Sequence, residues 1–142
     1  MDVIVAGSGS AGLAAAVCAA RNGADVLLVE RNSFLGGQST ASFQVWDGGP
    51  TDILTGFAKE MAVRLNEMGG AGLPEKYKTQ TAAKGIAPLS YHITIDPETW
   101  KFIAYDMIEE SGAKMITNTW VVDAIMENNT IKGIIIENKS GR

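Results

Sequence analysis

The stretch that decides the fold is VIVAGSGSAGLAAA, residues 3–16. The apolar run 3–6 precedes three glycines spaced as Gly-x-Gly-x-x-Gly, and an alanine-rich segment without proline follows. Uninterrupted apolar runs are typical of strands covered on both faces, so residues 3–6 are expected to form a central strand of a parallel sheet. We predict a helix over 10–21 that stops at Asn22–Gly23. A second apolar strand over 26–29 completes a βαβ unit with a right-handed crossover.

The glycine spacing predicts a backbone cradle for the pyrophosphate of a dinucleotide. Gly7 permits the sharp turn after the strand, Gly9 leaves room for the phosphates, and Gly12 lets the helix lie close to the sheet. The N–H groups of Ser10 and Ala11 would then face the phosphates at the positive end of the helix.

Glu30 ends the second predicted strand, where a carboxylate can accept both ribose hydroxyls of an adenosine and would repel a 2'-phosphate. These features indicate an adenine dinucleotide, either NAD or FAD. The doublet Gly36–Gly37 favours FAD, because a flavin dinucleotide extends further across the fold and needs a second close approach of the backbone.

The middle of the chain is less regular. Residues 43–51 include DGGP and are expected to be a turn-rich loop. Apolar residues from Ile53 onward recur at helical spacing and predict a helix that ends before Gly69–Gly70. Residues 71–90 show no period and are expected to connect elements or face a substrate.

The last third is regular again. Asp96, followed by Pro97, predicts a helix start, and Ser111–Gly112 predicts its end. Residues 114–117 indicate a short strand, and two apolar segments around ENNT, 120–126 and 131–136, predict an antiparallel hairpin. The predicted helix has one apolar face, made of Trp100, Ile103, Ala104, Met107 and Ile108.

Composition excludes several classes of function. Charged residues make up 20% of the 142 residues, the net charge is -4 and basic residues form no block, so we expect neither a nucleic-acid nor a membrane partner. The apolar N-terminal stretch is too short to span a bilayer, which favours a cytoplasmic protein. Cys18 is the single cysteine and is expected to be a small buried packing residue. One cysteine and one histidine, His92, predict no metal site.

The residues quoted above carry a family resemblance. VIVAGSGSAGLAAA followed by VLLVERNSFLGG, residues 26–37, resembles the N-terminal FAD-binding segment of the glutathione-reductase-like flavoproteins. Residues 95–141 resemble the corresponding region of the FAD-dependent dehydrogenase branch. The resemblance implies an α/β, Rossmann-like FAD/NAD(P)-binding fold, with a parallel sheet and an antiparallel β-hairpin.

The resemblance also implies which residues hold FAD. Those implied for the pyrophosphate are Gly7, Gly9, Ser10, Ala11 and Gly12. Those implied for the adenosine are Glu30 and Arg31 at the ribose and either Val121 or Val122 at the adenine. Those implied for the ribityl and flavin side are Gly36, Gly37, Gln38 and Ser39. No catalytic residue and no metal ligand is implied.

Two departures from the family pattern matter. The disulfide branch has a redox cysteine pair after the glycine doublet, but Gln38, Ser39 and Thr40 stand here, so dithiol chemistry is excluded. The family closes its site with a later strand ending in small residues, glycine and an acid, and no such stretch follows. We therefore expect an N-terminal portion of an FAD-binding domain that binds FAD weakly or not at all by itself. Its expected parts are the dinucleotide motif over 1–42, a substrate-side insertion over 43–92, and a helix, strand and hairpin over 93–142.

The function that these observations favour is the FAD-binding portion of an oxidoreductase that transfers a hydride from an organic substrate to FAD. An NAD-dependent dehydrogenase domain and a non-catalytic nucleotide-binding module stay open as alternatives. Unpaired strand edges also favour association into a homo-oligomer.

Overall fold

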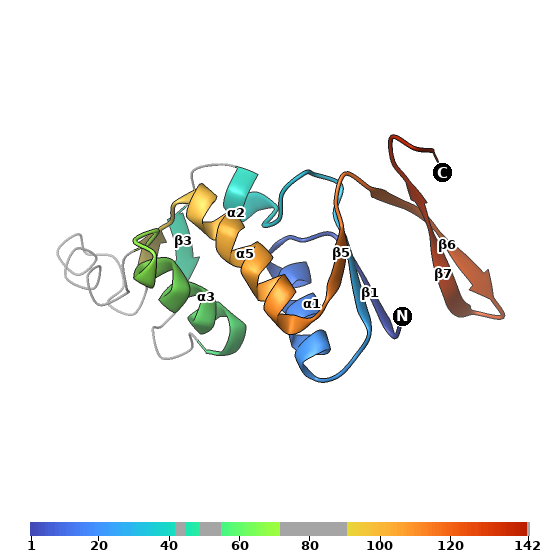
Figure 1. Ribbon diagram of the computed structural model, residues 1–142, viewed down its shortest axis with the longest axis horizontal. Coiled ribbons are helices and arrows are strands. Elements are labelled where there is room, and N and C mark those ends of the chain that lie inside the picture. The colour runs from blue at the N-terminus through green and yellow to red at the C-terminus, as the bar shows by residue number, and fades with distance from the viewer. Residues whose placement is uncertain (42–44, 49–54, 72–90, 142) are drawn as a thin grey trace. The chain divides into compact units, whose positions relative to one another are not determined.

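The computed structural model describes residues 1–41, 45–48, 55–71 and 91–141 (Figure 1). The chain divides into two compact units. The first consists of Met1–Gly37 and Met107–Arg142, and the second consists of Gln38–Asp106.

A three-stranded parallel sheet forms the centre of the first unit. Its order is β1 (Val3–Ala6), β2 (Val26–Val29) and β5 (Lys114–Ile116), and α1 (Ser10–Arg21) connects β1 to β2. Val3 pairs with Val26 and Leu27 with Lys114, both in parallel register. The predicted βαβ unit is therefore confirmed.

The position of β1 within this sheet differs from the prediction. The middle strand is β2, whose residues are mostly buried, whereas β1 is half-buried and pairs with β2 alone among the described strands. The expectation that residues 3–6 are central is wrong for this sheet, because an apolar run reports burial and does not report the order of neighbouring strands.

The helix α1 packs on both β1 and β2 through a face of small and branched residues. Leu13, Ala16 and Val17 are fully buried on this face. Cys18 lies on the opposite side and is exposed, so the expectation of a buried cysteine is wrong. The helix ends as predicted, because Gly23 adopts a φ of 90°, which favours glycine.

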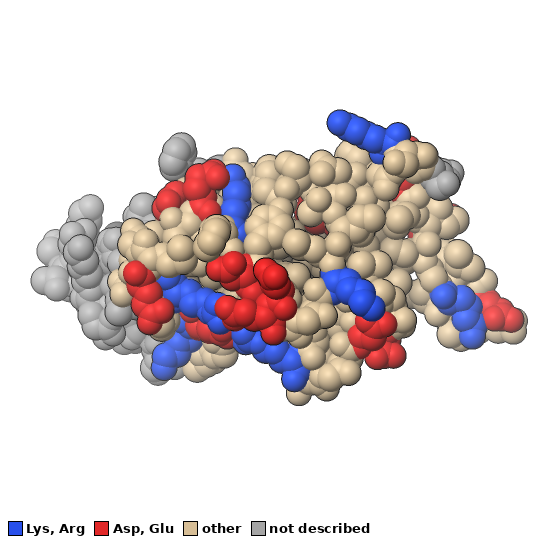
Figure 2. Space-filling model, viewed as in Figure 1, with Lys and Arg blue, Asp and Glu red and all other residues tan. Residues whose placement is uncertain are grey.

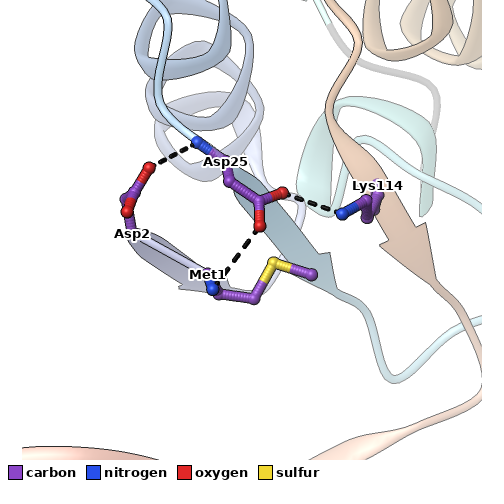
Figure 3. A network of polar contacts seen from close by, with 4 residues as sticks. All are labelled: Met1, Asp2, Asp25 and Lys114. Carbon is purple, nitrogen blue, oxygen red and sulfur yellow. Dashed lines mark hydrogen bonds and ion pairs between the residues drawn. The ribbon is translucent and has the colours of Figure 1, made fainter.

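Ion pairs join the starts of the three strands (Figure 3). Asp25, which precedes β2, accepts a hydrogen bond from Lys114 Nζ at 2.9 Å and pairs with the terminal amine of Met1 at 3.4 Å. Its own N–H donates to Asp2 Oδ2 at 2.8 Å. The hydrogen bond and charge of Lys114 lower the pKa of Asp25. These contacts link the starts of the three strands, at the end of the sheet opposite to the glycine turn.

The predicted hairpin is present as β6 (Trp120–Glu127) and β7 (Thr130–Glu137). Asn128 and Asn129 form its turn with φ values of 47° and 64°, a left-handed conformation that asparagine tolerates. Val121 pairs with Ile136 and Asp123 pairs with Ile135. Val122 is therefore the extra residue of a β-bulge, which redirects the side chains near the start of β6.

Within the described residues, the second unit contains two antiparallel strands, two complete helices and part of a third. It comprises α2 (Gln38–Ala41), β3 (Val45–Gly48), α3 (Gly56–Glu67) and β4 (Tyr91–Thr94), and it holds the first part of α5 (Pro97–Ser111). Val45 pairs with Thr94, so β3 and β4 are adjacent.

The loop expected over 43–51 is wrong at 45–48, because these residues pair with a strand far along the chain. The rest of that loop, the expected helix start at Ile53–Leu54, and residues 72–90 lie outside the described residues. The end of α3 agrees with the prediction, since Gly69 follows it with a φ of 75°.

Local chemistry explains the start of α5. Asp96 accepts hydrogen bonds from the Glu98 N–H at 3.1 Å and the Thr99 hydroxyl at 2.6 Å. These bonds, the one from Thr99 above all, lower the pKa of Asp96. The predicted apolar face is buried as expected, and it comprises Trp100, Ile103, Ala104, Met107 and Ile108.

Charges of both signs are mixed on the surface. Figure 2 shows acidic side chains beside basic ones on the face displayed. Within the described residues, no helix is long and apolar enough to cross a membrane, and no group of three acidic, histidine or cysteine side chains could hold a metal ion.

Candidate functional site

The glycine turn between β1 and α1 depends on two close approaches within the protein. Gly7 has a φ of 98°, and its N–H donates to the Val29 carbonyl at 2.7 Å. A Cβ on Gly12 would lie 2.0 Å from the carbonyl oxygen of Gly7. Gly7 is therefore required by its left-handed backbone conformation, and Gly12 by the close packing of α1 against the turn.

Gly9 is different, because the protein itself does not require a glycine there. Its φ is -59°, and no described atom lies within 4 Å of the position that a Cβ would occupy. Gly9 precedes α1, which has no side-chain cap and no acidic residue in its first turn. Ser10 and Ala11 are exposed. The positive end of the helix therefore faces open space beside Gly9 and can accept an anion there.

The second glycine pair lies directly against this turn. Gly36 forms a parallel β-bridge with Gly9, and its N–H donates to the Ser8 carbonyl at 2.9 Å. A Cβ on Gly37 would lie 3.0 Å from the Gly9 Cα. The structure thus brings together two predicted segments that are separated in sequence. Gln38 and Ser39, predicted for the flavin side, are the first residues of α2 in the second unit.

The Glu30 side chain is buried, with 4% of its surface exposed. Its Oε2 accepts hydrogen bonds from the Ser8 N–H at 2.7 Å and the Ser8 hydroxyl at 2.5 Å, and its Oε1 accepts one from the Asn32 N–H at 2.7 Å. Burial would raise the pKa of Glu30, but these hydrogen bonds and the charge of Arg31 together lower it. The carboxylate is therefore ionised at neutral pH.

The main chain of Glu30 connects β2 to the start of the hairpin. Its N–H donates to the Ile116 carbonyl at 2.9 Å, and its carbonyl accepts from the Thr119 N–H at 3.0 Å. The Asn118 N–H donates to the Asn32 carbonyl, also at 3.0 Å. The glycine turn, the end of β2 and the start of β6 thus meet around one carboxylate.

Glu30 lines a cavity of about 270 Å³. Its lining residues are Ala6, Gly7, Val29, Glu30, Arg31, Thr119, Trp120 and Val121. Val122, the other valine predicted for the adenine, is not among them, and its side chain is 42% exposed. The bulge at Val122 accounts for this difference between the two neighbours.

Sequence reasoning missed Ser8, which contacts Glu30, and four of the residues that line the cavity, namely Ala6, Val29, Thr119 and Trp120. Ser8 is fully buried against Glu30, whereas Thr119 and Trp120 both line the cavity, the first buried and the second half exposed. Trp120 could have been suspected, since it directly precedes the valines predicted for the adenine. Nothing in the sequence distinguishes Ser8 from the other small residues of the glycine turn.

The chain matches the model of the family described as FAD dependent oxidoreductase over residues 2–142. It is 33% identical to a thiamine thiazole synthase from Aeropyrum pernix over 139 residues, which is 95% of this chain and 43% of that protein. It is 28% identical to protein FixC from Escherichia coli, covering 94% of this chain and 32% of that protein. It therefore spans less than half the length of these relatives.

Among solved structures, the chain is similar to a glycerol-3-phosphate dehydrogenase from Bacillus halodurans in complex with FAD. The TM-score is 0.64 at 21% identity, and the match covers 99% of this chain and 31% of that one. At this identity the similarity establishes the fold.

The hydrogen bonds of Glu30 predict how stability depends on pH. Glu30→Gln should lower the free energy of unfolding by about 1–3 kcal/mol near pH 7, because an amide NH2 placed at Oε2 or Oε1 would face N–H and O–H donors. The folded pKa lies below the ordinary value of 4.5, so the stabilisation by the ionised group is present above that value and is lost as the pH falls through the folded pKa. Urea unfolding at a series of pH values measures how the free energy of unfolding of both proteins depends on pH.

The matched control is Glu109→Gln, which alters an exposed carboxylate on α5 and should change stability little at any pH. A difference between the wild type and Glu30→Gln that stays constant from about pH 7 down to about pH 3 would contradict this account of the carboxylate.

Proposed function

The chain belongs to the FAD-dependent oxidoreductase family, and from that premise we propose that its first unit holds the ADP half of FAD. Membership confirms the predicted Rossmann-like fold class and the predicted cofactor, FAD. The residues that would hold each part of the cofactor are our proposal, supported by their geometry.

The pyrophosphate is assigned to the glycine turn and the first turn of α1. Gly7 and Gly12 shape the turn, Gly9 leaves space for the phosphates, and the N–H groups of Ser10 and Ala11 stabilise their charge. The observation that supports this assignment is Gly9, since no described atom lies within 4 Å of the position that a Cβ on this residue would occupy.

The adenosine is assigned to the cavity beside Glu30. The carboxylate would accept a hydrogen bond from the ribose, Arg31 would border the ribose, and Val121 and Trp120 would contact the adenine. The cavity supports this assignment because its lining combines an acidic residue, Glu30, with apolar residues. Between the two valines predicted for the adenine, we propose Val121, because Val122 does not line the cavity.

The ribityl and flavin side is assigned to Gly36, Gly37, Gln38 and Ser39. The β-bridge between Gly36 and Gly9 supports this assignment, because it places a second glycine backbone beside the glycine turn to which the pyrophosphate is assigned. The second unit, Gln38–Asp106, contains residues 43–92, to which we assign the substrate side. A compact unit separate from the dinucleotide unit supports that role.

For the whole enzyme we propose transfer of a hydride from a small organic substrate to FAD. When bound, FAD supplies the redox chemistry, and the residues above bind and orient it. The relatives are named for different reactions, so their names do not narrow the substrate class. No residue of this chain is assigned a catalytic role.

We further propose a cytoplasmic protein with no nucleic-acid or membrane partner. The net charge of -4 and the mixing of acidic with basic side chains support this. Self-association is also proposed, because β1 pairs on one side only among the described strands and an open strand edge can pair with another chain.

The binding assignment can be tested at Gly9. Gly9→Ala should leave the free energy of unfolding unchanged within about 0.5 kcal/mol, because the new Cβ meets no described atom and the backbone conformation is ordinary. The same change should weaken ADP binding by about tenfold or more, because the Cβ would fill the space assigned to the phosphates. Calorimetric unfolding and an NMR titration with ADP measure the two effects.

The contrasting variant is Gly12→Ala, which should reduce stability by about 3 kcal/mol because its Cβ would collide with the Gly7 carbonyl. Equal ADP affinities of the wild type and Gly9→Ala would refute the pyrophosphate assignment.

The oxidoreductase proposal is tested on the full-length natural polypeptide. We expect a flavin absorption spectrum that is bleached by an organic hydride donor or, as a positive control, by dithionite. A folded protein that takes up no FAD, or whose flavin no donor from a panel of small alcohols, amines and hydroxy acids can bleach, would argue for a non-catalytic nucleotide-binding module.

A further inference from the structure

The two strands of the second unit place the single histidine of the chain opposite an aspartate. In the antiparallel register of β3 and β4, His92 pairs with Asp47. Directly opposite residues of an antiparallel pair lie on the same face of the sheet, with Cβ atoms about 4.5–5.5 Å apart. The two residues are far apart in the sequence, so the strand pairing alone brings them together.

The two faces of this strand pair differ in chemistry. Successive residues of a strand alternate between its faces. One face therefore carries Asp47 and His92, and the other carries Trp46 and Ile93, which are also directly opposite each other. The residues suited to acid–base chemistry are thus together on one face, and the apolar residues are on the other.

The fold anchors the strand that carries His92. Ile95 directly follows β4, is 5% exposed and forms an antiparallel bridge with Ala71. The Asp96 N–H donates to the Gly70 carbonyl at 2.7 Å, just before the start of α5. These contacts tie the end of β4 to the residues that follow α3, within the same unit. A site on an anchored strand can hold a reacting group in the fixed position that catalysis requires.

The proposed reaction releases a proton as well as a hydride. When an alcohol, an amine or a hydroxy acid is oxidised, a hydride goes from carbon to FAD, and the O–H or N–H bond of the same group loses its proton. A base within hydrogen-bond reach accelerates such a step, and imidazole suits this role because its ordinary pKa lies near neutral pH. Asp47 and His92 lie in the unit that contains the proposed substrate side, Gln38–Asp106.

Other carboxylates of this unit are engaged by neighbouring residues. Glu60 pairs with Arg64 at 2.9 Å, and Glu98 pairs with Lys101 at 2.6 Å. Asp96 accepts hydrogen bonds at the start of α5. These three groups serve the helices α3 and α5, and a histidine is the better acceptor for a proton near neutral pH.

We propose that Asp47 and His92 form the acid–base pair of the substrate side. His92 is the catalytic residue, and Asp47 is a positioning residue that orients its imidazole. In the step, the O–H or N–H bond of the substrate breaks and its proton goes to the unprotonated ring nitrogen of His92. The C=O or C=N bond of the product forms as the hydride goes from carbon to FAD. The proposal deepens the proposed function and rests on it, because it assumes a substrate that FAD oxidises.

The pairing is tested by NMR titration of the full-length natural polypeptide without substrate. The ring signals of His92 are identified by their loss in His92→Gln. In Asp47→Asn the midpoint of the His92 titration should fall by about 1 pH unit or more, because a nearby carboxylate favours the imidazolium. Asp47→Glu should keep most of the wild-type midpoint. Asp123→Asn, at an exposed aspartate of β6 in the other unit, is the matched control and should leave the midpoint unchanged.

The catalytic role is tested by the rate at which an organic donor bleaches the flavin of the same polypeptide. His92→Gln should bleach about 100-fold or more slowly than the wild type, and Asp47→Asn about tenfold more slowly. Dithionite should bleach the wild type and both variants equally fast, because its reaction needs no base from the protein. Equal bleaching by dithionite also shows that each variant is folded and holds FAD.

Two outcomes would overturn the proposal. An unchanged His92 midpoint in Asp47→Asn would show that the two side chains do not interact, whereas a merely structural role of Asp47 would alter only the melting temperature. Bleaching of His92→Gln by the organic donor at the wild-type rate would show that the histidine accepts no proton. Failure of the wild type to take up FAD would instead refute the proposed function, and the NMR titration still tests the pairing in that case.

Discussion

The buried carboxylate of Glu30 is the group on which the rest of the site depends. At 4% exposure it is stable only if donors surround it, and those donors come from Ser8 in the glycine turn and from the N–H of Asn32 after β2. The main chain of the same residue bonds to Ile116 and Thr119. Glu30 therefore fixes the distance between the glycine turn and the start of the hairpin, and residues of both line the cavity.

The two ends of the site offer different chemistry. The start of α1 has N–H groups and no acidic residue, which suits an anion, whereas the cavity presents an acceptor, which suits a hydroxyl. The parallel bridge between Gly9 and Gly36 adds further backbone next to the phosphate position. A diphosphate joined to a ribose has this same order of groups, which is why we propose that the first unit holds an ADP moiety.

The sequence was informative where the determinants are local. The strands β1 and β2 were predicted from the apolar runs 3–6 and 26–29, and the start of α5 was predicted from the cap at Asp96. Local patterns suffice there because strand burial and helix capping depend on neighbouring residues. The strand at 45–48 was missed, since its partner lies far along the chain and its second half, Asp47–Gly48, belongs to the turn-rich stretch DGGP. The position of β1 in the sheet also depends on which strands pair across the fold. The hydrogen bond of Ser8 likewise depends on a distant partner, the carboxylate of Glu30, 22 residues along the chain.

The central claim is that the glycine turn and Glu30 together hold an ADP moiety. A crystal structure of the 142-residue chain soaked with ADP tests it most directly. The account predicts the diphosphate within hydrogen-bond distance of the first N–H groups of α1 and the ribose within hydrogen-bond distance of the Glu30 carboxylate. ADP bound elsewhere, or bound in the cavity with its ribose turned away from Glu30, would contradict it.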